Sequence, residues 1–470
     1  MALERAYFLP HPPLAIPYIG EGEEKKIKDT LDAYHVVGRE IAKIAPETII
    51  FITPHTTQYA DYFHISPGTR ASGSLSHFLR NKSHKKEVSF QVEYDKELVY
   101  QIAQCANEDR ILAGDIGEKD PALDHGVMVP MWFINQHTKD YKVVRVSVSS
   151  MTPEEHYRFG LSIARAVEMS GKRVVLIASG DLSHKLSEAG NYGYSMEGKI
   201  FDQTMTTALK YGDFLALLFV SDSLRSQAAE CGFNPCMILA GSLDGFEIDS
   251  SLYSYEGPFG VGYCVASMTP LALDSGRCFL EKHKKVLIEN ANKCREMEDA
   301  YQSLARQSLE YTTKVKKKLK LPKGLPSEML EKQAGVFVSI YKNKRLRGCV
   351  GTFVPTTENI ALEIIQNAVS AGFADKRFDE ITVGELRELT YHVDVLSPPE
   401  PIKSPKELDV RKYGVIVRSG NKKGLLLPDL EGIDTVEEQI EIAKRKAGIS
   451  KKEKIELERF YVKRHAYEEE

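Results

Sequence analysis

The chain has 470 residues, which is too long for one ordinary core and predicts two or three domains. Its hydrophobic content of 42% and charged content of 27% are typical of a folded globular protein and argue against disorder. The formal net charge of −4 gives no electrostatic reason to expect a nucleic-acid partner.

The seven cysteines are scattered and form no CxxC pair, so we expect a reducing compartment and no disulfide framework. The first residues lack the uninterrupted apolar stretch of a signal peptide. No run approaches the roughly 20 apolar residues that a membrane span requires. We therefore expect a cytoplasmic protein that has no membrane partner.

Residues 1–272 alternate apolar runs with amphipathic stretches, which predicts an α/β domain whose central sheet is flanked by helices. Thr152 and Pro153 predict the N-cap and first turn of a helix that continues to about residue 170. Strands are expected at 5–9, 48–53, 143–148, 173–178 and 261–267, and further helices at 23–45, 196–210, 223–231 and 235–241.

Residues 290–470 predict a smaller α+β domain, and the boundary is expected within 270–295. Residues 278–320 are charged and helical in pattern, and they end in a basic run at 314–318. We interpret this run as a solvated face near a helix C-terminus, where cations suit the dipole, although an anion or RNA patch is the alternative. After a loop at 321–326, strands are expected at 335–341, 389–396 and 414–418, with helices at 359–371 and 435–447.

Histidines follow several of the predicted strands in the first domain. His11 follows the first strand, His55 follows the second, and His184 comes after the strand at 173–178 through a Gly-Asp turn. His125 is expected in a loop. Because the ends of parallel strands meet at one edge of a sheet, we expect these side chains to converge. Imidazoles together with one carboxylate are the ligand set that suits non-haem Fe(II).

These segments resemble the class III extradiol ring-cleavage dioxygenases of the LigB type and the Memo proteins that share their fold, over roughly residues 1–270. The resemblance implies that His11 and His55 bind the metal. The third ligand would be Glu230, in the segment Ala229-Glu230-Cys231-Gly232. Memo proteins place a cysteine before this glycine, so Cys231 is the alternative ligand.

The resemblance also implies roles for the neighbouring residues. His184, in a Leu-Ser-His segment, would be the acid/base, and His125, in an Asp-His-Gly segment, would face the substrate. Asp181 either orients one of these rings or only forms the turn after Gly180.

The implied activity is Fe(II)-dependent dioxygenation of a catechol-type or related small aromatic substrate by O₂. If Cys231 binds instead of Glu230, the site is softer and suits copper or zinc. The alternative function is then a Memo-like metal-binding redox or scaffold protein without dioxygenase activity. A zinc hydrolase is a third and weaker interpretation.

The second domain resembles the AMMECR family, whose signature matches Leu346-Arg347-Gly348-Cys349-Val350-Gly351. Segments 375–378 and 425–428 also match. Arg347, Gly348, Cys349 and Gly351 form the candidate site, because glycines permit a close ligand approach and an arginine binds carboxylate or phosphate. A structural glycine turn with a buried cysteine is the stronger alternative. The pairing of these two families implies a radical-SAM protein as a possible partner.

Overall fold

A computed structural model describes residues 2–80, 84, 88–119, 122–430, 432–450 and 452–467 of the chain. The chain divides into two compact units, Met1–His283 and Lys284–Glu470. Among the described residues, no helix is long and apolar enough to cross a membrane.

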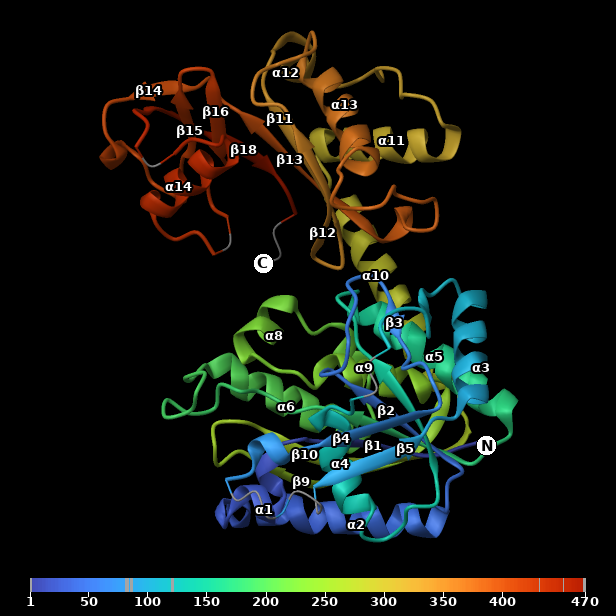
Figure 1. The fold of residues 1–470 in the computed structure, drawn as a ribbon. Helices are drawn as coiled ribbons and strands as arrows, with labels where there is room; N and C mark the ends of the chain where they lie inside the picture. The colour runs from blue at the N-terminus through green and yellow to red at the C-terminus, as the bar shows by residue number, and fades with distance from the viewer. Residues whose placement is uncertain are drawn as a thin grey trace. The chain divides into compact units, whose positions relative to one another are not determined.

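The N-terminal unit is built on a six-stranded sheet in the order β7-β2-β8-β1-β10-β9 (Figure 1). Its first four strands are parallel: β7 (Lys142–Ser147), β2 (Thr48–Thr53), β8 (Val174–Ser179) and β1 (Leu3–Leu9). β10 (Tyr263–Leu273) and β9 (Phe246–Glu256) follow as antiparallel neighbours. The carboxyl ends of the four parallel strands therefore lie along one edge of the sheet.

Helices cover both faces of this sheet (Figure 1). On one face lie α2 (Lys28–Ile44) and α4 (His125–Ile134), whose core includes Tyr7 and Phe51. On the other face, the core includes Phe8 and Ile52, and its helices are α3 (Lys96–Glu108), α5 (Pro153–Ser170), α6 (Met196–Tyr211) and α9 (Phe233–Ser242). Burial on both faces explains why β2 and β8 are buried throughout and have few polar residues.

Shorter elements complete the N-terminal unit. They are α1 (Pro17–Gly20), α7 (Leu215–Leu218), α8 (Asp222–Ala228), the parallel pair β3 (Phe63–His64) and β6 (Ala113–Gly114), and the antiparallel pair β4 (Arg70–Ser74) and β5 (Ser89–Glu93). The helix α10 (Phe279–Glu296) contains the boundary between the two units.

The C-terminal unit contains two four-stranded antiparallel sheets. The first is β12 (Arg345–Gly351), β11 (Val336–Lys342), β13 (Leu389–Leu396) and β18 (Val462–His465), and α11 (Ala300–Val315), α12 (Ser327–Glu331) and α13 (Ile360–Phe373) pack on one of its faces. The second is β14 (Glu400–Ile402), β17 (Glu456–Phe460), β15 (Gly414–Ser419) and β16 (Lys422–Leu426), which packs with α14 (Val436–Lys446).

The predicted fold class is confirmed: a sheet flanked by helices is followed by a smaller unit rich in strands. Thr152 caps α5 in a capping box with Glu155, as its sequence position predicts. The helical character expected for 278–320 is confirmed and is divided between two helices, because Asp299 caps α11 after α10 has ended at Glu296. The expected loop around His125 is wrong, since this residue begins α4.

Candidate metal centre

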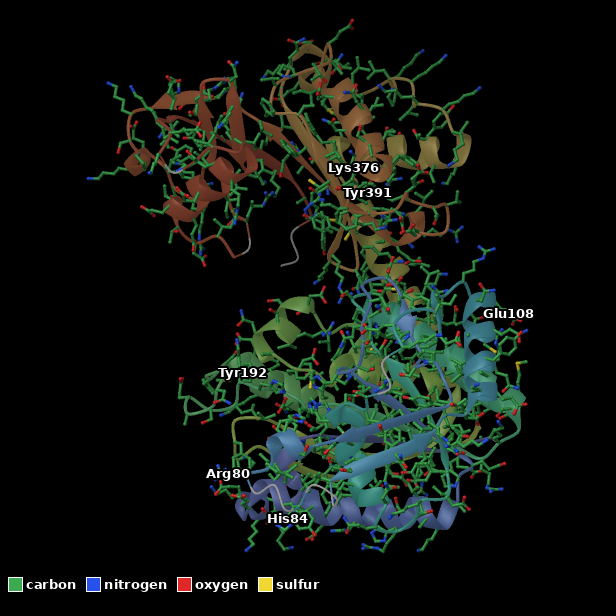
Figure 2. The ribbon with its side chains drawn as sticks, in the orientation of Figure 1. Arg80, His84, Glu108, Tyr192, Lys376 and Tyr391 are labelled. Carbon is green, nitrogen blue, oxygen red and sulfur yellow. The ribbon has the colours of Figure 1, made fainter. Side chains whose placement is uncertain are left out.

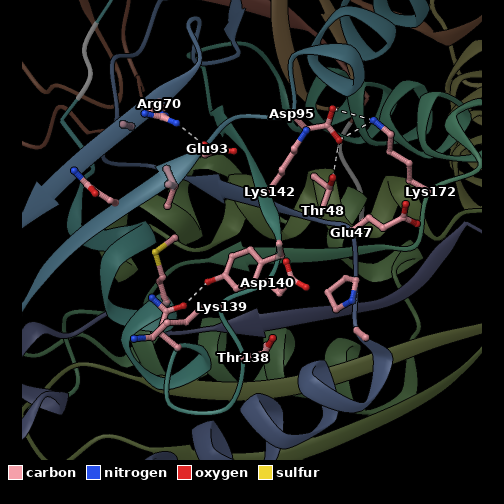
Figure 3. Close-up of a pocket in the computed structure, with 18 of the residues that line it drawn as sticks. Glu47, Thr48, Arg70, Glu93, Asp95, Thr138, Lys139, Asp140, Lys142 and Lys172 are labelled. Atoms are coloured by element: carbon pink, nitrogen blue, oxygen red, sulfur yellow. Dashed lines mark hydrogen bonds and ion pairs between the residues drawn. The ribbon is translucent and has the colours of Figure 1, made fainter.

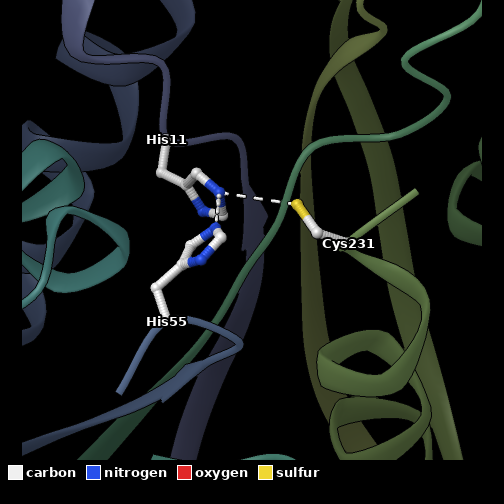
Figure 4. A group of neighbouring side chains, drawn as sticks. All are labelled: His11, His55 and Cys231. Carbon is white, nitrogen blue, oxygen red and sulfur yellow. Dashed lines mark hydrogen bonds between the residues drawn. The ribbon is translucent and has the colours of Figure 1, made fainter. Parts of the chain in front are cut away.

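His11, His55 and Cys231 bring three metal-binding atoms together at the carboxyl edge of the sheet (Figure 4). The Nε2 atoms of His11 and His55 are 3.0 Å apart, and the Sγ atom of Cys231 is 3.5 Å from Nε2 of His11. Donor atoms bound at about 2.1 to 2.3 Å to one ion are separated by roughly 3 to 3.6 Å, so these spacings suit a shared metal ion.

The strand order explains how residues so distant in sequence meet. β8 lies between β1 and β2, so the two strands that precede His11 and His55 are not direct neighbours. All three strands are parallel, however, and their ends lie side by side. His11 is buried against this edge, whereas His55 lies further out and is exposed.

Ser179, the last residue of β8, fixes the orientation of His11. The Ser179 hydroxyl donates a hydrogen bond to the backbone carbonyl of Gly126, so its oxygen is left to accept from Nδ1 of His11 at 3.0 Å. This hydrogen bond places the ring proton on Nδ1 and leaves the lone pair of Nε2 facing Cys231 and His55. A hydrogen-bond partner on the far nitrogen is the usual arrangement behind a metal-binding histidine.

Thr53 and Asp124 support the second histidine. The Thr53 hydroxyl donates to Oδ1 of Asp124 at 2.6 Å and accepts from the backbone N–H of His55 at 3.2 Å. Asp124 immediately precedes His125, so one hydroxyl links the segments that carry both imidazoles. The rings of His55 and His125 stack at 4.1 Å.

Two glycines allow the segment that carries Cys231 to reach the site. A Cβ atom on Gly180 would lie 2.2 Å from the Cα atom of Gly232, which no real side chain tolerates. The turn after β8 and the turn before α9 therefore touch backbone to backbone. In this arrangement the backbone N–H of Asp181 points at the Cys231 sulfur, 3.3 Å away.

The carboxylate of Glu230 is occupied by partners other than the two histidines. It accepts from Nε of Arg225 at 3.0 Å and from the backbone N–H of Phe233 at 2.7 Å, and its side chain is only 5% exposed. Phe233 begins α9, so Glu230 satisfies an N–H at the start of that helix. Of the two sequence candidates for the third ligand, the structure brings Cys231 and not Glu230 into the group of metal-binding atoms.

His125, His184 and Asp181 surround these three side chains. The ring of His125 lies 5.1 Å from that of His11, and Nε2 of His184 lies 4.0 Å from the Cys231 sulfur. The Asp181 carboxylate accepts from the backbone N–H of His11 at 2.9 Å. Asp181 therefore orients the backbone of His11, and no hydrogen bond between its carboxylate and a histidine ring occurs in the described part of the chain.

The protonation states suit binding of a cation. Burial lowers the pKa of His11 well below its ordinary range, and burial together with His125 lowers that of His55 to about 4, so both imidazoles are neutral near pH 7. Burial raises the pKa of the Cys231 thiol well above its usual range. A bound metal cation deprotonates such a thiol, so two neutral imidazoles and one thiolate fit a transition-metal ion, and this softer set favours copper or zinc.

Comparison with known proteins identifies the family. The family model for the catalytic LigB subunit of aromatic ring-opening dioxygenase matches residues 5–266. The chain belongs to the LigB family. A second model, AMMECR1, matches residues 302–465, so we call Met1–His283 the LigB unit and Lys284–Glu470 the AMMECR1 unit.

Three similar proteins have names that state no activity. A Clostridium acetobutylicum protein named Protein CA_C1420 is 41% identical over 99% of both chains. A Thermotoga maritima protein is 46% identical over 36% of this chain and 98% of its own length. A solved structure of an uncharacterized protein, PH0010 from Pyrococcus horikoshii, covers 36% of this chain and 90% of its own, with 29% identity and a TM-score of 0.33.

Two aromatic side chains beside the LigB centre were not singled out in the sequence. Tyr192, on the segment before α6 (Figure 2), is 58% exposed and its ring lies 5.2 Å from that of His184. Phe78 is 38% exposed and lies 6.3 Å from His125. Ser179 and Thr53 were missed as well, although each ends a predicted strand next to a candidate ligand, a position that would have marked them as supports.

A pocket of about 1040 Å³ lies elsewhere in the LigB unit (Figure 3). It is lined by Thr48 and Lys142, the first residues of β2 and β7, whereas His55 follows the last residue of β2. The pocket therefore opens at the opposite edge of the sheet from the histidines. Asp95 is held there by Lys172 and by Thr48, which makes this region a partly exposed ion-pair network rather than part of the metal centre.

In the AMMECR1 unit, the signature glycines have structural roles. A Cβ on Gly348 would lie 2.1 Å from the carbonyl oxygen of Ala371 in α13, and one on Gly351 would lie 2.2 Å from the ring of Phe337. The Arg347 guanidinium is paired with Glu385 at 2.9 Å. Cys349 is half-buried and points to the face of the sheet opposite Gly348 and the packed helices.

Proposed function

We propose that the LigB unit is a metal-dependent redox protein of the Memo kind, in which His11, His55 and Cys231 hold a transition-metal ion. The observation that carries this proposal is the meeting of these three donor atoms within 4.8 Å of one another, while the Glu230 carboxylate is engaged by Arg225. A thiolate and two imidazoles are the donors that copper and zinc prefer. When bound, the ion would supply a redox-active or Lewis-acidic centre.

The residues around the ion would handle protons and substrate. His184 and His125 have pKa values lowered mainly by burial, so both imidazoles are neutral near pH 7 and able to accept a proton from a bound molecule. The exposed ring of Tyr192 beside His184 gives a planar molecule a surface on which to stack.

The second candidate function is an Fe(II)-dependent extradiol dioxygenase that acts on a catechol-type substrate and O₂. Two observations favour it: the match to a catalytic dioxygenase subunit, and the two additional histidines beside the candidate ligands. The donor set argues against it, because the carboxylate of the usual two-histidine, one-carboxylate iron site is replaced by sulfur.

Metal analysis of matched variants tests the proposal. Protein purified without oxygen should contain about one ion per chain, and Cys231→Ser should lose most of it, whereas Glu230→Gln should keep it once folding is verified. Cobalt substitution should give a sulfur-to-metal charge-transfer band that Cys231→Ser abolishes. Metal loss in Glu230→Gln alone, together with iron content and catechol-dependent O₂ uptake, would instead establish the dioxygenase.

A further inference from the structure

The outer face of the first sheet in the AMMECR1 unit carries a row of reactive side chains. Cys349 pairs with Ser339 across β12 and β11, and Ser339 pairs with His392 across β11 and β13. Directly paired residues share a face, so thiol, hydroxyl and imidazole stand side by side. The Ser339 hydroxyl donates to the Cys349 sulfur at 3.3 Å, and Tyr341 lies against His392 with its ring 4.6 Å away.

This face is not the one that packs against α11 and α13, and its end at Phe337 and Leu396 packs against the second sheet. The alternate residues of the same strands, including Val338, Ile340 and Val393, form the core with α11 and α13. Cys349, Ser339, Tyr341 and His392 are all only partly buried. A nucleophile, a base and two hydroxyl groups therefore share a surface that solvent reaches.

Two cationic side chains lie near the Cys349 thiol. Arg377 donates to the backbone carbonyl of Cys349 at 3.4 Å, and Asp375, its ion-pair partner, accepts the backbone N–H of Cys349 at 2.9 Å. Lys446, the last residue of α14, interacts electrostatically with both Cys349 and Arg377. Among the described residues no carboxylate forms an ion pair with Lys446, so this cation is free to meet an anion. Arg377 is paired with Asp375, but its side chain is 58% exposed and remains accessible to an anion from solvent.

We propose that this face is a second reaction centre, at which the Cys349 thiol attacks an electrophilic carbon of a small carboxylate-bearing compound held by Arg377 and Lys446. A sulfur electron pair forms the bond to carbon, and the bond from that carbon to its leaving group breaks. The leaving group departs with the bonding pair. The imidazole of His392, which lies on the same face and pairs with Ser339 across the strands, takes up the thiol proton and passes it to solvent.

The protonation states agree with the need for a base. Burial raises the pKa of the Cys349 thiol, so the thiol keeps its proton near pH 7 until a base removes it. Burial lowers the pKa of His392, so its imidazole is neutral there and able to accept that proton. This site uses no residue of the metal centre, so the result of its test does not depend on whether the LigB unit binds a metal.

Competitive alkylation of the full chain tests the proposal. Iodoacetate carries a carboxylate and iodoacetamide does not, and mass spectrometry reports the rate of each at every cysteine. Cys278 is the internal comparison, because it is also partly buried but lies near three carboxylates, those of Asp244, Asp274 and Glu281, which outnumber the neighbouring cation Lys282. The iodoacetate-to-iodoacetamide rate ratio at Cys349 should exceed that at Cys278 by about fivefold or more. This is the rate increase expected when one cation lies about 4 Å from the reagent's carboxylate in water.

Single substitutions separate the roles. Lys446→Gln should lower the ratio at Cys349 severalfold, whereas Arg445→Gln, at the neighbouring exposed position of α14, should leave it unchanged. His392→Gln should slow both reagents at pH 7 without changing the ratio. Equal ratios at Cys349 and Cys278, equal effects of the two α14 substitutions, or an unchanged rate in His392→Gln would overturn the proposal.

Discussion

Cys231 and Cys349 are both half-buried cysteines whose pKa is raised chiefly by burial, yet their surroundings differ. Cys231 faces imidazole nitrogens of His11 and His184, and in the part of the chain that the structure describes no cationic side chain forms a hydrogen bond with its sulfur. Cys349 faces the Ser339 hydroxyl and has the cations Arg377 and Lys446 nearby, together with the carboxylates of Asp375 and Asp394. The first thiol needs a cation from outside to ionise, whereas the second already has cations beside it.

This contrast teaches that neighbouring groups, and not the cysteine itself, determine what each thiol does. Lone pairs that converge with a sulfur form a ligand set, and they repel any anionic reactant. Cations and a base beside a sulfur form a nucleophile site for anions. Substitutions that remove one feature of either site therefore have distinct expected outcomes.

The largest expected effect is that of His11→Ala. It removes a buried imidazole whose Nε2 faces both His55 and Cys231. Metal affinity should fall by more than about 100-fold, because loss of a ligand costs more than loss of a residue that only hydrogen-bonds to a ligand. Elemental analysis and a competition titration with a chelator measure it. His137→Ala, at an exposed position of the same unit, is the control and should bind metal as the parent does. Equal metal content in both variants would end the assignment.

The next effect distinguishes a ligand histidine from a structural one. His156 is fully buried like His11, but both of its nitrogens are used within the protein: Nδ1 donates to the Thr152 carbonyl at 2.9 Å, and Nε2 accepts from the Ser149 N–H at 3.2 Å. Burial lowers the pKa of His156 to about 4. In the unfolded chain, His156 has its ordinary pKa near 6.5. Between about pH 4 and pH 6.5 this residue is therefore protonated in the unfolded chain but not in the folded chain.

The free energy of unfolding should consequently fall as the pH drops from about 6.5 to about 4, and His156 should contribute about 3 kcal/mol of that loss at most. Denaturant titrations of metal-free protein at several pH values measure the slope. His156→Gln should flatten it over this window. Parallel curves for the parent and His156→Gln would show that His156 is protonated in the folded state.

A smaller effect is expected at the two ends of β2. Thr53→Val removes the hydroxyl that links Asp124 to the backbone of His55 and should weaken metal binding about tenfold. Thr48→Val, at the start of the same strand, removes a comparable hydrogen bond to Asp95 and is the matched control. It should cost stability without changing metal affinity. Similar metal affinities for the two variants would exclude Thr53 from a supporting role.

The sequence predicts the edge of the LigB sheet well, because the signals there are local. The run at 48–53 is apolar throughout and forms β2 with those bounds, and the histidines after β1, β2 and β8 meet because these strands are parallel. Strand order is a tertiary property, so the position of β8 between β1 and β2 could not be predicted. The edge strand β9 was missed, since its polar, half-exposed residues give no apolar run.

The choice between Glu230 and Cys231 could not be made from the sequence either. Both residues precede α9, and only the folded position of Arg225, which takes the Glu230 carboxylate, separates them. In the AMMECR1 signature, local chemistry was equally ambiguous. Whether Arg347 meets a ligand or a carboxylate of the protein depends on Glu385, which is 38 residues away.

The smallest predicted effect concerns this arginine. Arg347 is 18% exposed, pairs with Glu385 through Nε and Nη2, and donates to the Asp379 carbonyl at 2.8 Å. Arg347→Met keeps most of the side-chain volume but loses these bonds, so the free energy of unfolding of the AMMECR1 unit should fall by about 1 to 2 kcal/mol. The exposed Arg387→Met should change it by less than about 0.5 kcal/mol.

Alkylation separates this structural role from a role in ligand binding. Because the Arg347 guanidinium is already occupied by Glu385, whereas Lys446 has no carboxylate partner in the described ranges, Arg347→Met should leave the iodoacetate-to-iodoacetamide ratio at Cys349 unchanged. A lowered ratio with unchanged stability would mean that Arg347 releases Glu385 and contacts the anion. The cationic side of the Cys349 face would then include the arginine of the signature as well as Arg377 and Lys446.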